Sequence, residues 1–185
     1  SIRCGYRPPR RDGSVGRYPH LIDRAKPGLI AVTADGRRFV NEAGPYHDFM
    51  RALFAATPPG QSVAAWLICD SRFLHRYGLG AVKPFPVPKG FYLRSGYLKR
   101  GDSLAALAAA CGIEAPSLAD SIAAHNADAA SGEDRAFGRG GTPFQRAGGD
   151  ARIGPNPCLA AIAKPPFYAV KILSLIHISE PTRPY

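Results

Sequence analysis

The stretch VAAWLICD, residues 63–70, places the strongest restriction on how this chain folds. It is a continuous apolar run that ends at Asp70, and a short run of this kind is typical of a buried strand. A bilayer-spanning helix needs about 18–20 apolar residues, and no run in the sequence approaches that length. The sequence therefore predicts a globular protein with no membrane partner.

Short strands and helices are predicted on both sides of this run. GLIAV (28–32) and RRFV (37–40) flank an Asp35-Gly36 turn and predict a hairpin, and PFYAVKI predicts a last strand over 166–172. Helices are predicted for 71–80, 102–112 and 117–132, the last with a capping box from Ser117 to Asp120. Residues 83–90, rich in proline, predict an extended segment, and 132–150 a long loop. Because no βαβ repeat is visible, the predicted fold class is α+β.

The clearest helix follows the sequence GRRFVNEAGPYHDF, residues 36–49. Tyr46, Phe49, Met50, Leu53 and Phe54 recur at helical spacing and form one apolar face. Gly44 is the expected N-cap, and Pro45 suits the first helical position, where its missing N–H is not needed. A strand therefore passes into a helix at a point crowded with polar groups.

The net charge of +10 is concentrated near the start of the chain, where residues 1–38 hold nine Lys and Arg against three Asp. Such a balance attracts nucleic acid, but the basic residues are scattered among Gly and Pro without a recognition motif, so a nucleic-acid partner is not expected. A basic, non-catalytic binding module stays open as an alternative function. It requires the arginines of 1–38 and 139–152 to form one face.

The four cysteines, Cys4, Cys69, Cys111 and Cys158, are far apart and have no metal-site spacing. Cys69 and Cys111 lie in apolar contexts and are expected to be small buried side chains. This usage favours a reducing, cytoplasmic environment and predicts no metal site.

The chain contains neither the G-x-G-x-x-G fingerprint nor a Walker A motif. A different set of segments carries a resemblance. In order these are PHLIDRAKPGLIAV, DGRRFVNEAGPYHDF, AWLICD, GYLKRGDSLAALA, FGRG, PNPCLA and PPFYAVKI. Together they resemble the flavoprotein family of fumarate reductases, succinate dehydrogenases and 3-ketosteroid dehydrogenases over residues 17–172. In that family a cap domain is inserted into a Rossmann-type FAD domain.

The resemblance implies that this chain is a fragment with its FAD domain largely missing. Residues 1–28 are then the lead-in from the FAD domain, 29–149 the cap, and 150–172 the return. The FAD site is expected to lie mostly outside the chain, with the missing FAD domain as a partner in the same polypeptide. Residues 173–185, LSLIHISEPTRPY, look like a translated sequencing adapter and are expected not to belong to the family.

The resemblance also implies site residues. Glu42 is expected in the substrate cleft. Fumarate reductases place an arginine a few residues after this glutamate, whereas this chain has Gly44, Pro45 and Tyr46 there. A tyrosine at this place is typical of the ketosteroid enzymes, where it removes a proton beside a carbonyl. Tyr168 matches the tyrosine that hydrogen-bonds the substrate carbonyl. The implied reaction is α,β-dehydrogenation of a ketone such as a 3-ketosteroid, with a dicarboxylate oxidoreductase as the alternative.

Elementary chemistry is consistent with Tyr46 as a base. A phenol titrates near pH ~10 in water, but the first turn of a helix and a nearby cation both favour its charged form. Packing of Tyr46 or Tyr168 in the core is the alternative interpretation of each. Among the other polar residues, His47 and His20 are expected to be solvated or satisfied, Arg37 and Arg38 to lie in a solvated turn, and Asn156 to shape a turn. Arg139 is expected either to bind an anion or to lie in a mobile loop.

Overall fold

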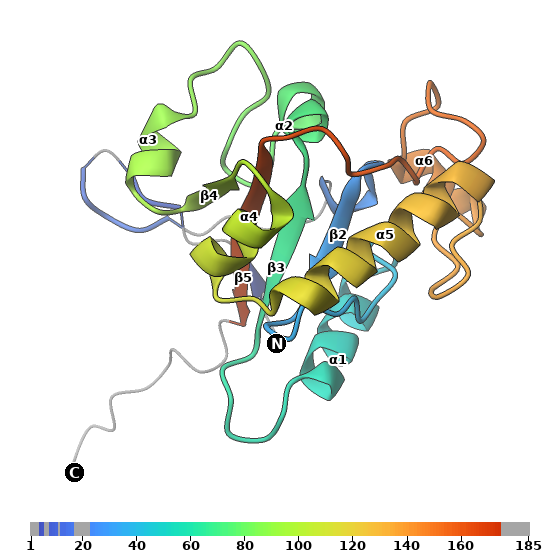
Figure 1. Ribbon diagram of the computed structural model, residues 1–185, viewed down its shortest axis with the longest axis horizontal. Helices are drawn as coiled ribbons and strands as arrows, with labels where there is room; N and C mark the ends of the chain where they lie inside the picture. The colour runs from blue at the N-terminus through green and yellow to red at the C-terminus, as the bar shows by residue number, and fades with distance from the viewer. Residues whose placement is uncertain (1–3, 6–7, 11, 17–22, 175–185) are drawn as a thin grey trace.

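The protein is described from a computed structural model, which covers residues 4–5, 8–10, 12–16 and 23–174. Among these residues a five-stranded sheet forms the centre of the molecule (Figure 1). Its strands are β1 (Cys4–Gly5), β2 (Leu29–Val32), β3 (Ala64–Cys69), β4 (Leu98–Gly101) and β5 (Phe167–Ser174). β3 lies between β2 and β5, and both β4 and β1 pair with β5. Every pairing is antiparallel, and this mixture of helices with an antiparallel sheet agrees with the predicted α+β class.

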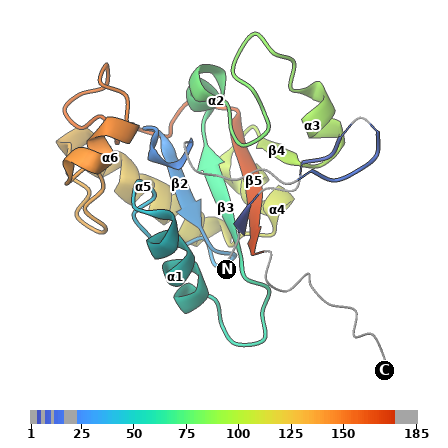
Figure 2. The same ribbon diagram turned by 180° about the vertical axis from the view of Figure 1, so that it is seen from behind.

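Helices cover both faces of this sheet. They are the 3-10 turn η1 (Asp23–Ala25) and the helices α1 (Tyr46–Ala56), α2 (Ser71–Tyr77), α3 (Gly90–Arg94), α4 (Leu104–Cys111), α5 (Ala115–Ser131) and α6 (Pro143–Gly148). α4 and α5 cross in front of the sheet in Figure 1, and α1 lies against the opposite face in Figure 2. The sheet is therefore the middle layer of three.

The alternation of side chains along β3 explains why its sequence is apolar throughout. Leu67 belongs to the core that the sheet forms with α1 and α2, whereas its neighbour Ile68 belongs to the core formed with α4 and α5. On β5, Val170 and Ala169 divide between the same two cores. A strand buried on both faces has no position for an exposed polar side chain, so the prediction of a buried strand is confirmed.

The predicted hairpin is only half formed. Its turn is present, because the backbone N–H of Gly36 donates to Thr33 O at 3.0 Å, but the returning arm contributes a single bridge between Arg38 and Val32. Gly36 has φ +78°, and a Cβ there would lie 2.6 Å from the backbone nitrogen of Leu118. Only glycine lets this turn approach the start of α5 so closely.

Other boundaries differ from the prediction. α1 begins at Tyr46 with Pro45 as its N-cap, one residue later than expected. α5 begins at Ala115 with Glu114 as its N-cap, so the predicted capping box at Ser117 is wrong. The hydroxyl of Ser117 donates to the Glu114 carboxylate instead. α3, β4 and α6 were not predicted, because each is short and lies in a stretch rich in Gly or Pro.

β5 extends through Leu173 to Ser174, into the first two residues of the segment expected to lie outside the family. Leu173 is opposite Ala64 of β3 and Gly5 of β1. The remainder of that segment, 175–185, lies outside the described residues. Within the described part of the chain, no helix has the length and apolarity that a membrane crossing requires.

Candidate functional site

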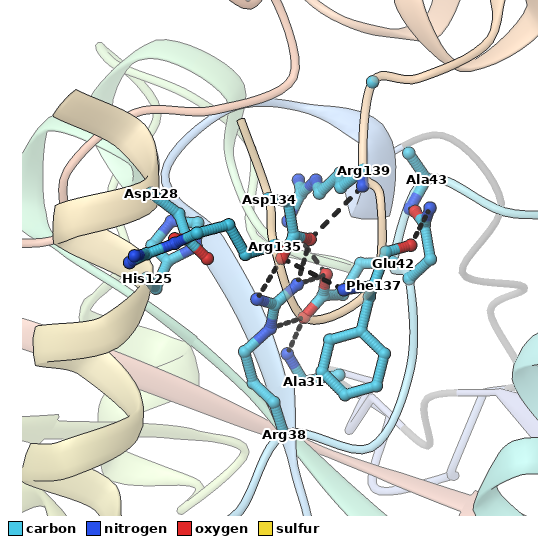
Figure 3. Close-up of polar contacts among 12 residues, drawn as sticks. Ala31, Arg38, Glu42, Ala43, His125, Asp128, Asp134, Arg135, Phe137 and Arg139 are labelled. Carbon is cyan, nitrogen blue, oxygen red and sulfur yellow. Dashed lines mark hydrogen bonds and ion pairs between the residues drawn. The ribbon is translucent and has the colours of Figure 1, made fainter. Parts of the chain in front are cut away.

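Glu42 lies in a buried ionic cluster between β2 and α1 (Figure 3). Its Oε1 accepts from the backbone N–H of Ala31 at 2.9 Å and from Arg38 Nε at 3.0 Å. Its Oε2 is 2.8 Å from Arg38 Nη2 and 3.1 Å from Arg139 Nη1. Burial alone would raise the pKa of Glu42, but the charges of Arg38 and Arg139 and these hydrogen bonds lower it below its ordinary value. Both carboxylate oxygens are thus occupied by protein donors, and the geometry gives no support to the expected catalytic role.

Arg139 joins the glycine-rich segment FGRGG to the sheet. Its guanidinium is completely buried and donates to the carbonyl oxygens of Leu29, Arg24 and Lys26 at 2.6, 2.9 and 2.7 Å. Asn156 in turn donates to the Arg139 carbonyl oxygen at 3.0 Å and accepts from the backbone N–H of Cys158, which confirms its turn-shaping role. The expectation of a mobile or anion-binding Arg139 is therefore wrong, because its donors are directed into the protein.

Arg38 is the second residue whose predicted environment is wrong. It was expected in a solvated turn, but its side chain is only 7% exposed and bridges Glu42 and Asp134, with 3.0 Å between Nη2 and Asp134 Oδ2. Its guanidinium also lies over the ring of Phe137, 4.9 Å from the centroid. The cluster therefore connects the β2–α1 junction to a segment almost one hundred residues later (Figure 3). The polar junction noted in the sequence is largely structural.

His125 of α5 is a buried titratable residue that the sequence did not indicate. It has no exposed surface, and its Nε2 donates to the carbonyl oxygen of Ala160 at 3.0 Å. Nδ1 has no hydrogen-bond partner in the described structure. Burial, followed by the charge of Arg139, lowers the pKa of His125 to about 4. The imidazole is therefore neutral at neutral pH.

The burial of His125 predicts how the free energy of unfolding depends on pH. The unfolded chain binds a proton at His125 near pH ~6.5, whereas the folded chain does so only near pH 4. The free energy of unfolding is therefore expected to fall as the pH drops from about 7 to 5.5, with a slope approaching about 1.4 kcal/mol per pH unit. Urea titrations of the wild type and His125→Gln over this window measure the slope, which the substitution should flatten. Equal slopes in the two proteins would count against the buried neutral histidine.

Tyr46 is the first residue of α1 and is partly buried against the core on the α1 and α2 face of the sheet. His47, beside it, is exposed, as expected. Tyr168 belongs to the same core, is only 2% exposed, and lies opposite Cys69 of β3 and Arg100 of β4. The two tyrosines thus contribute to one face of the sheet. His20 lies outside the described residues.

A groove of about 970 Å³ opens beside Tyr168, between α2 and the segment 82–89. Tyr46 is not among the described residues that line it, so the structure does not bring the two tyrosines into one hollow. The other tyrosine in the lining, Tyr77, donates to Asp150 at 2.6 Å. Burial and this hydrogen bond raise the pKa of Tyr77 to about 12, which makes it a poor base.

A model of the family described as "FAD binding domain" matches residues 6–180. The chain belongs to this FAD binding domain family. Its relatives include 4-oxocyclohex-2-ene-1-carboxylate 5-dehydrogenase of Sinomonas cyclohexanicum, 43% identical over 88% of the chain and 28% of that protein. The 3-oxosteroid 1-dehydrogenase of Mycobacterium tuberculosis is 34% identical over 83% of the chain and 28% of that protein. The chain thus spans just over a quarter of these relatives.

Two solved structures resemble the chain. The 3-ketosteroid delta1-dehydrogenase from Sterolibacterium denitrificans, in complex with 1,4-androstadiene-3,17-dione, has a TM-score of 0.82 and 36% identity, over 91% of this chain and 31% of that one. A fumarate reductase flavoprotein subunit from Lactobacillus plantarum, solved by solution NMR, has a TM-score of 0.54 at 22% identity, over 81% and 85% of the two chains. The second likeness shows a shared fold. The predicted family resemblance is confirmed.

FAD is the cofactor of this family, but the N-terminus of α2, which directly follows β3, does not offer a place for its diphosphate. Such a site places phosphate at the N-terminus of a helix that follows a strand. β3 leads directly into α2, yet Asp70 caps that helix and accepts from the backbone N–H groups of Arg72 and Phe73, at 3.0 Å each. A carboxylate therefore occupies the position that a phosphate requires.

We therefore expect the 185-residue chain, purified alone, to retain no flavin. The reason is that the sequence has no glycine-rich phosphate-binding fingerprint and that the Asp70 carboxylate caps α2, the helix that directly follows β3. The visible absorbance of the chain after incubation with FAD and gel filtration measures this directly, with free FAD in the same column as the control. Flavin that elutes with the chain in equimolar amount would contradict the prediction.

Proposed function

We propose that this chain is the substrate-side part of an FAD-dependent dehydrogenase that converts a ketone to its α,β-unsaturated product. The relatives with the highest identities among those above act, by name, on an oxocyclohexene carboxylate and on 3-oxosteroids. The observation that carries the proposal is a tyrosine of the final strand, Tyr168, beside a groove large enough for a cyclic ketone. The alternative, a dicarboxylate oxidoreductase, has support from a relative named as a probable fumarate reductase of Shewanella frigidimarina, at 29% identity.

In the proposed reaction Tyr46, which does not line the groove beside Tyr168, removes the proton alpha to the carbonyl when the full-length enzyme presents the substrate to both tyrosines. The flavin would supply the acceptor for the hydride of the neighbouring carbon. The position of Tyr46 supports a basic role, because the N–H groups of the first turn of α1 favour negative charge nearby. Tyr168 donates a hydrogen bond to the carbonyl oxygen, where negative charge develops. Glu42 holds the β2–α1 junction, and so the start of α1, through its bonds to Ala31 and Arg38.

We also propose that residues 29–174 fold as one unit within the full-length protein, and that the lead-in before residue 29 adds β1 to the sheet of this unit. β5, from the segment expected to return to the FAD domain, has β3 along one edge and β4 along the other. A boundary at residues 149 and 150 would divide a single sheet, so the cap and the first part of the return segment are better treated together. The missing FAD domain stays the proposed partner of this unit.

A reducing, cytoplasmic location is part of the proposal. Cys69, Cys111 and Cys158 are free thiols, and Cys69 is fully buried. Cys111 is only partly buried, less than expected.

The rival proposal of a basic binding module has less support, because Arg24, Arg38 and Arg139 are buried and directed inward. The test of the function is whether the full-length protein forms an α,β-unsaturated ketone from a saturated one.

A further inference from the structure

A second groove, of about 420 Å³, lies beside α4, β4 and β5 (Figure 1), and we call it the α4 groove. The residues that line it include Trp66, Tyr97, Lys99, Ala110, Cys111 and Lys171. Trp66 belongs to the core on the α4 and α5 face of the sheet, whereas Tyr168 belongs to the core on the other face. The α4 groove shares no lining residue with the groove beside Tyr168, so the proposed reaction does not use it.

Two lysines are neighbours in the α4 groove. Lys99 of β4 is opposite Ala169 of β5, and Lys171 lies two residues further along β5. Because alternate residues of a strand share a face, the two lysines are diagonal neighbours on one face of the sheet. Residues in that relation are about 7–8 Å apart. The long, flexible side chains of both lysines can therefore reach one ligand.

The described part of the chain provides no counter-charge for these lysines. The described lining of the groove holds no Asp or Glu, and neither lysine forms an ion pair with a described carboxylate. Burial raises the pKa of the Cys111 thiol to about 12, although the charges of Lys99 and Lys171 act in the opposite direction. The thiol is therefore neutral at neutral pH. Since the two ammonium groups repel each other, an anion with two negative charges would stabilise both.

Aromatic rings form the apolar part of the same groove. Trp66 is directly opposite Lys171 in the β3–β5 register, and the Lys171 Nζ lies over its ring, 5.6 Å from the centroid. Tyr97 supplies a second ring, whose hydroxyl accepts from the backbone N–H of Ala81 at 3.1 Å. A volume of about 420 Å³ admits a small ligand. Such a ligand can place a flat apolar body beside the rings and an anionic group beside the lysines.

We propose that the α4 groove binds a phosphate monoester with an aromatic body, and that Lys99 and Lys171 bind its phosphate. A phosphate monoester carries a charge of about −1.5 to −2 at pH 7, which matches two ammonium groups. A phosphodiester or a monocarboxylate carries only one negative charge and would leave one lysine without a counter-charge. This site is independent of the proposed dehydrogenase reaction, because its residues lie on the other face of the sheet.

The test measures binding of phenyl phosphate to the full-length protein by calorimetry. Lys99→Gln and Lys171→Gln are each expected to weaken binding roughly tenfold, which corresponds to the loss of about one ion pair near a protein surface. Lys171→Arg keeps the charge, so its affinity should stay within about twofold of the wild type. Ala110→Phe should abolish binding, because Ala110 is an exposed residue of α4 that lines the groove and the added ring would fill it.

Lys83→Gln is the matched control. Lys83 is also an exposed lysine, but it lines the groove beside Tyr168 and does not line the α4 groove. The substitution removes the same charge from the protein, and we expect it to leave the binding of phenyl phosphate unchanged. Equal losses of affinity in Lys83→Gln and Lys171→Gln would reduce the effect to net charge and overturn the proposal.

Two further ligands test the chemistry of the site. Methyl phenyl phosphate is a diester with one negative charge, and inorganic phosphate lacks the ring. Each should bind roughly tenfold more weakly than phenyl phosphate, because the first loses a charge and the second loses the apolar contact. A diester that binds as tightly as phenyl phosphate would indicate a nucleic-acid backbone as the ligand. That result, equal binding of inorganic phosphate, or no saturable binding of phenyl phosphate would each overturn the proposal.

Discussion

Replacement of Tyr46 by phenylalanine is expected to lower kcat of the full-length enzyme by roughly 10²–10⁴-fold, the range for loss of a general acid or base. The substitution removes the phenolic oxygen and keeps the ring, so the packing of the start of α1 against the core should survive. KM should change little, because Tyr168 and the groove beside it are untouched. Steady-state kinetics with a saturated ketone and an artificial electron acceptor measure both quantities.

Tyr92→Phe is the control for this prediction. Tyr92 is also a partly buried tyrosine packed against the same core, in α3, and the proposed chemistry does not use it. The full-length Tyr92→Phe variant should turn over the saturated ketone at the wild-type rate. If Tyr46→Phe is as active as Tyr92→Phe, Tyr46 is a packing residue and the proposed proton transfer is wrong.

Glu42→Gln should destabilise the chain by roughly 3–5 kcal/mol, the effect of removing one partner from a buried ion pair. Glu42 has a side chain with no exposure and accepts from both Arg38 and Arg139. The amide keeps the shape but leaves two buried guanidinium groups without their shared counter-charge. Urea denaturation of the chain gives the difference in the free energy of unfolding.

Asp102→Asn is the matched control, because Asp102 also pairs with an arginine at 2.8 Å but both side chains are exposed. We expect that control to lose at most about 1 kcal/mol. A loss for Glu42→Gln as small as that for Asp102→Asn would mean that the buried cluster does not hold the β2–α1 junction. A variant that is stable but inactive would instead restore Glu42 as a catalytic candidate.

The sequence predicts those strands and helices whose hydrophobic pattern is local. The run VAAWLICD gives a central strand because β3 is apolar on both faces, and the spacing of Phe49, Met50 and Leu53 gives α1 because these three side chains are its buried stripe. α6 has a local signal that was missed, namely Thr142 as N-cap and Pro143 in the first turn.

The ionic cluster could not be predicted in the same way. Local sequence patterns place Arg38, Asp134 and Arg139 in surface loops. Their burial depends on partners about one hundred residues away in the sequence. The same holds for Lys89, whose position over Tyr168 depends on how the segment 82–89 folds back over the end of β5. Tyr46 and Tyr168 were identified from the resemblance to the flavoprotein family. The structure adds that both pack in the core on the same face of the sheet.

The most direct test of the account is the product that the full-length protein forms from 4-oxocyclohexanecarboxylate in the presence of an electron acceptor, with succinate assayed in parallel. The account predicts an α,β-unsaturated keto acid, formed at a rate that falls in Tyr46→Phe, and no oxidation of succinate. Oxidation of succinate with no reaction of the ketone would contradict it and identify the parent as a dicarboxylate oxidoreductase.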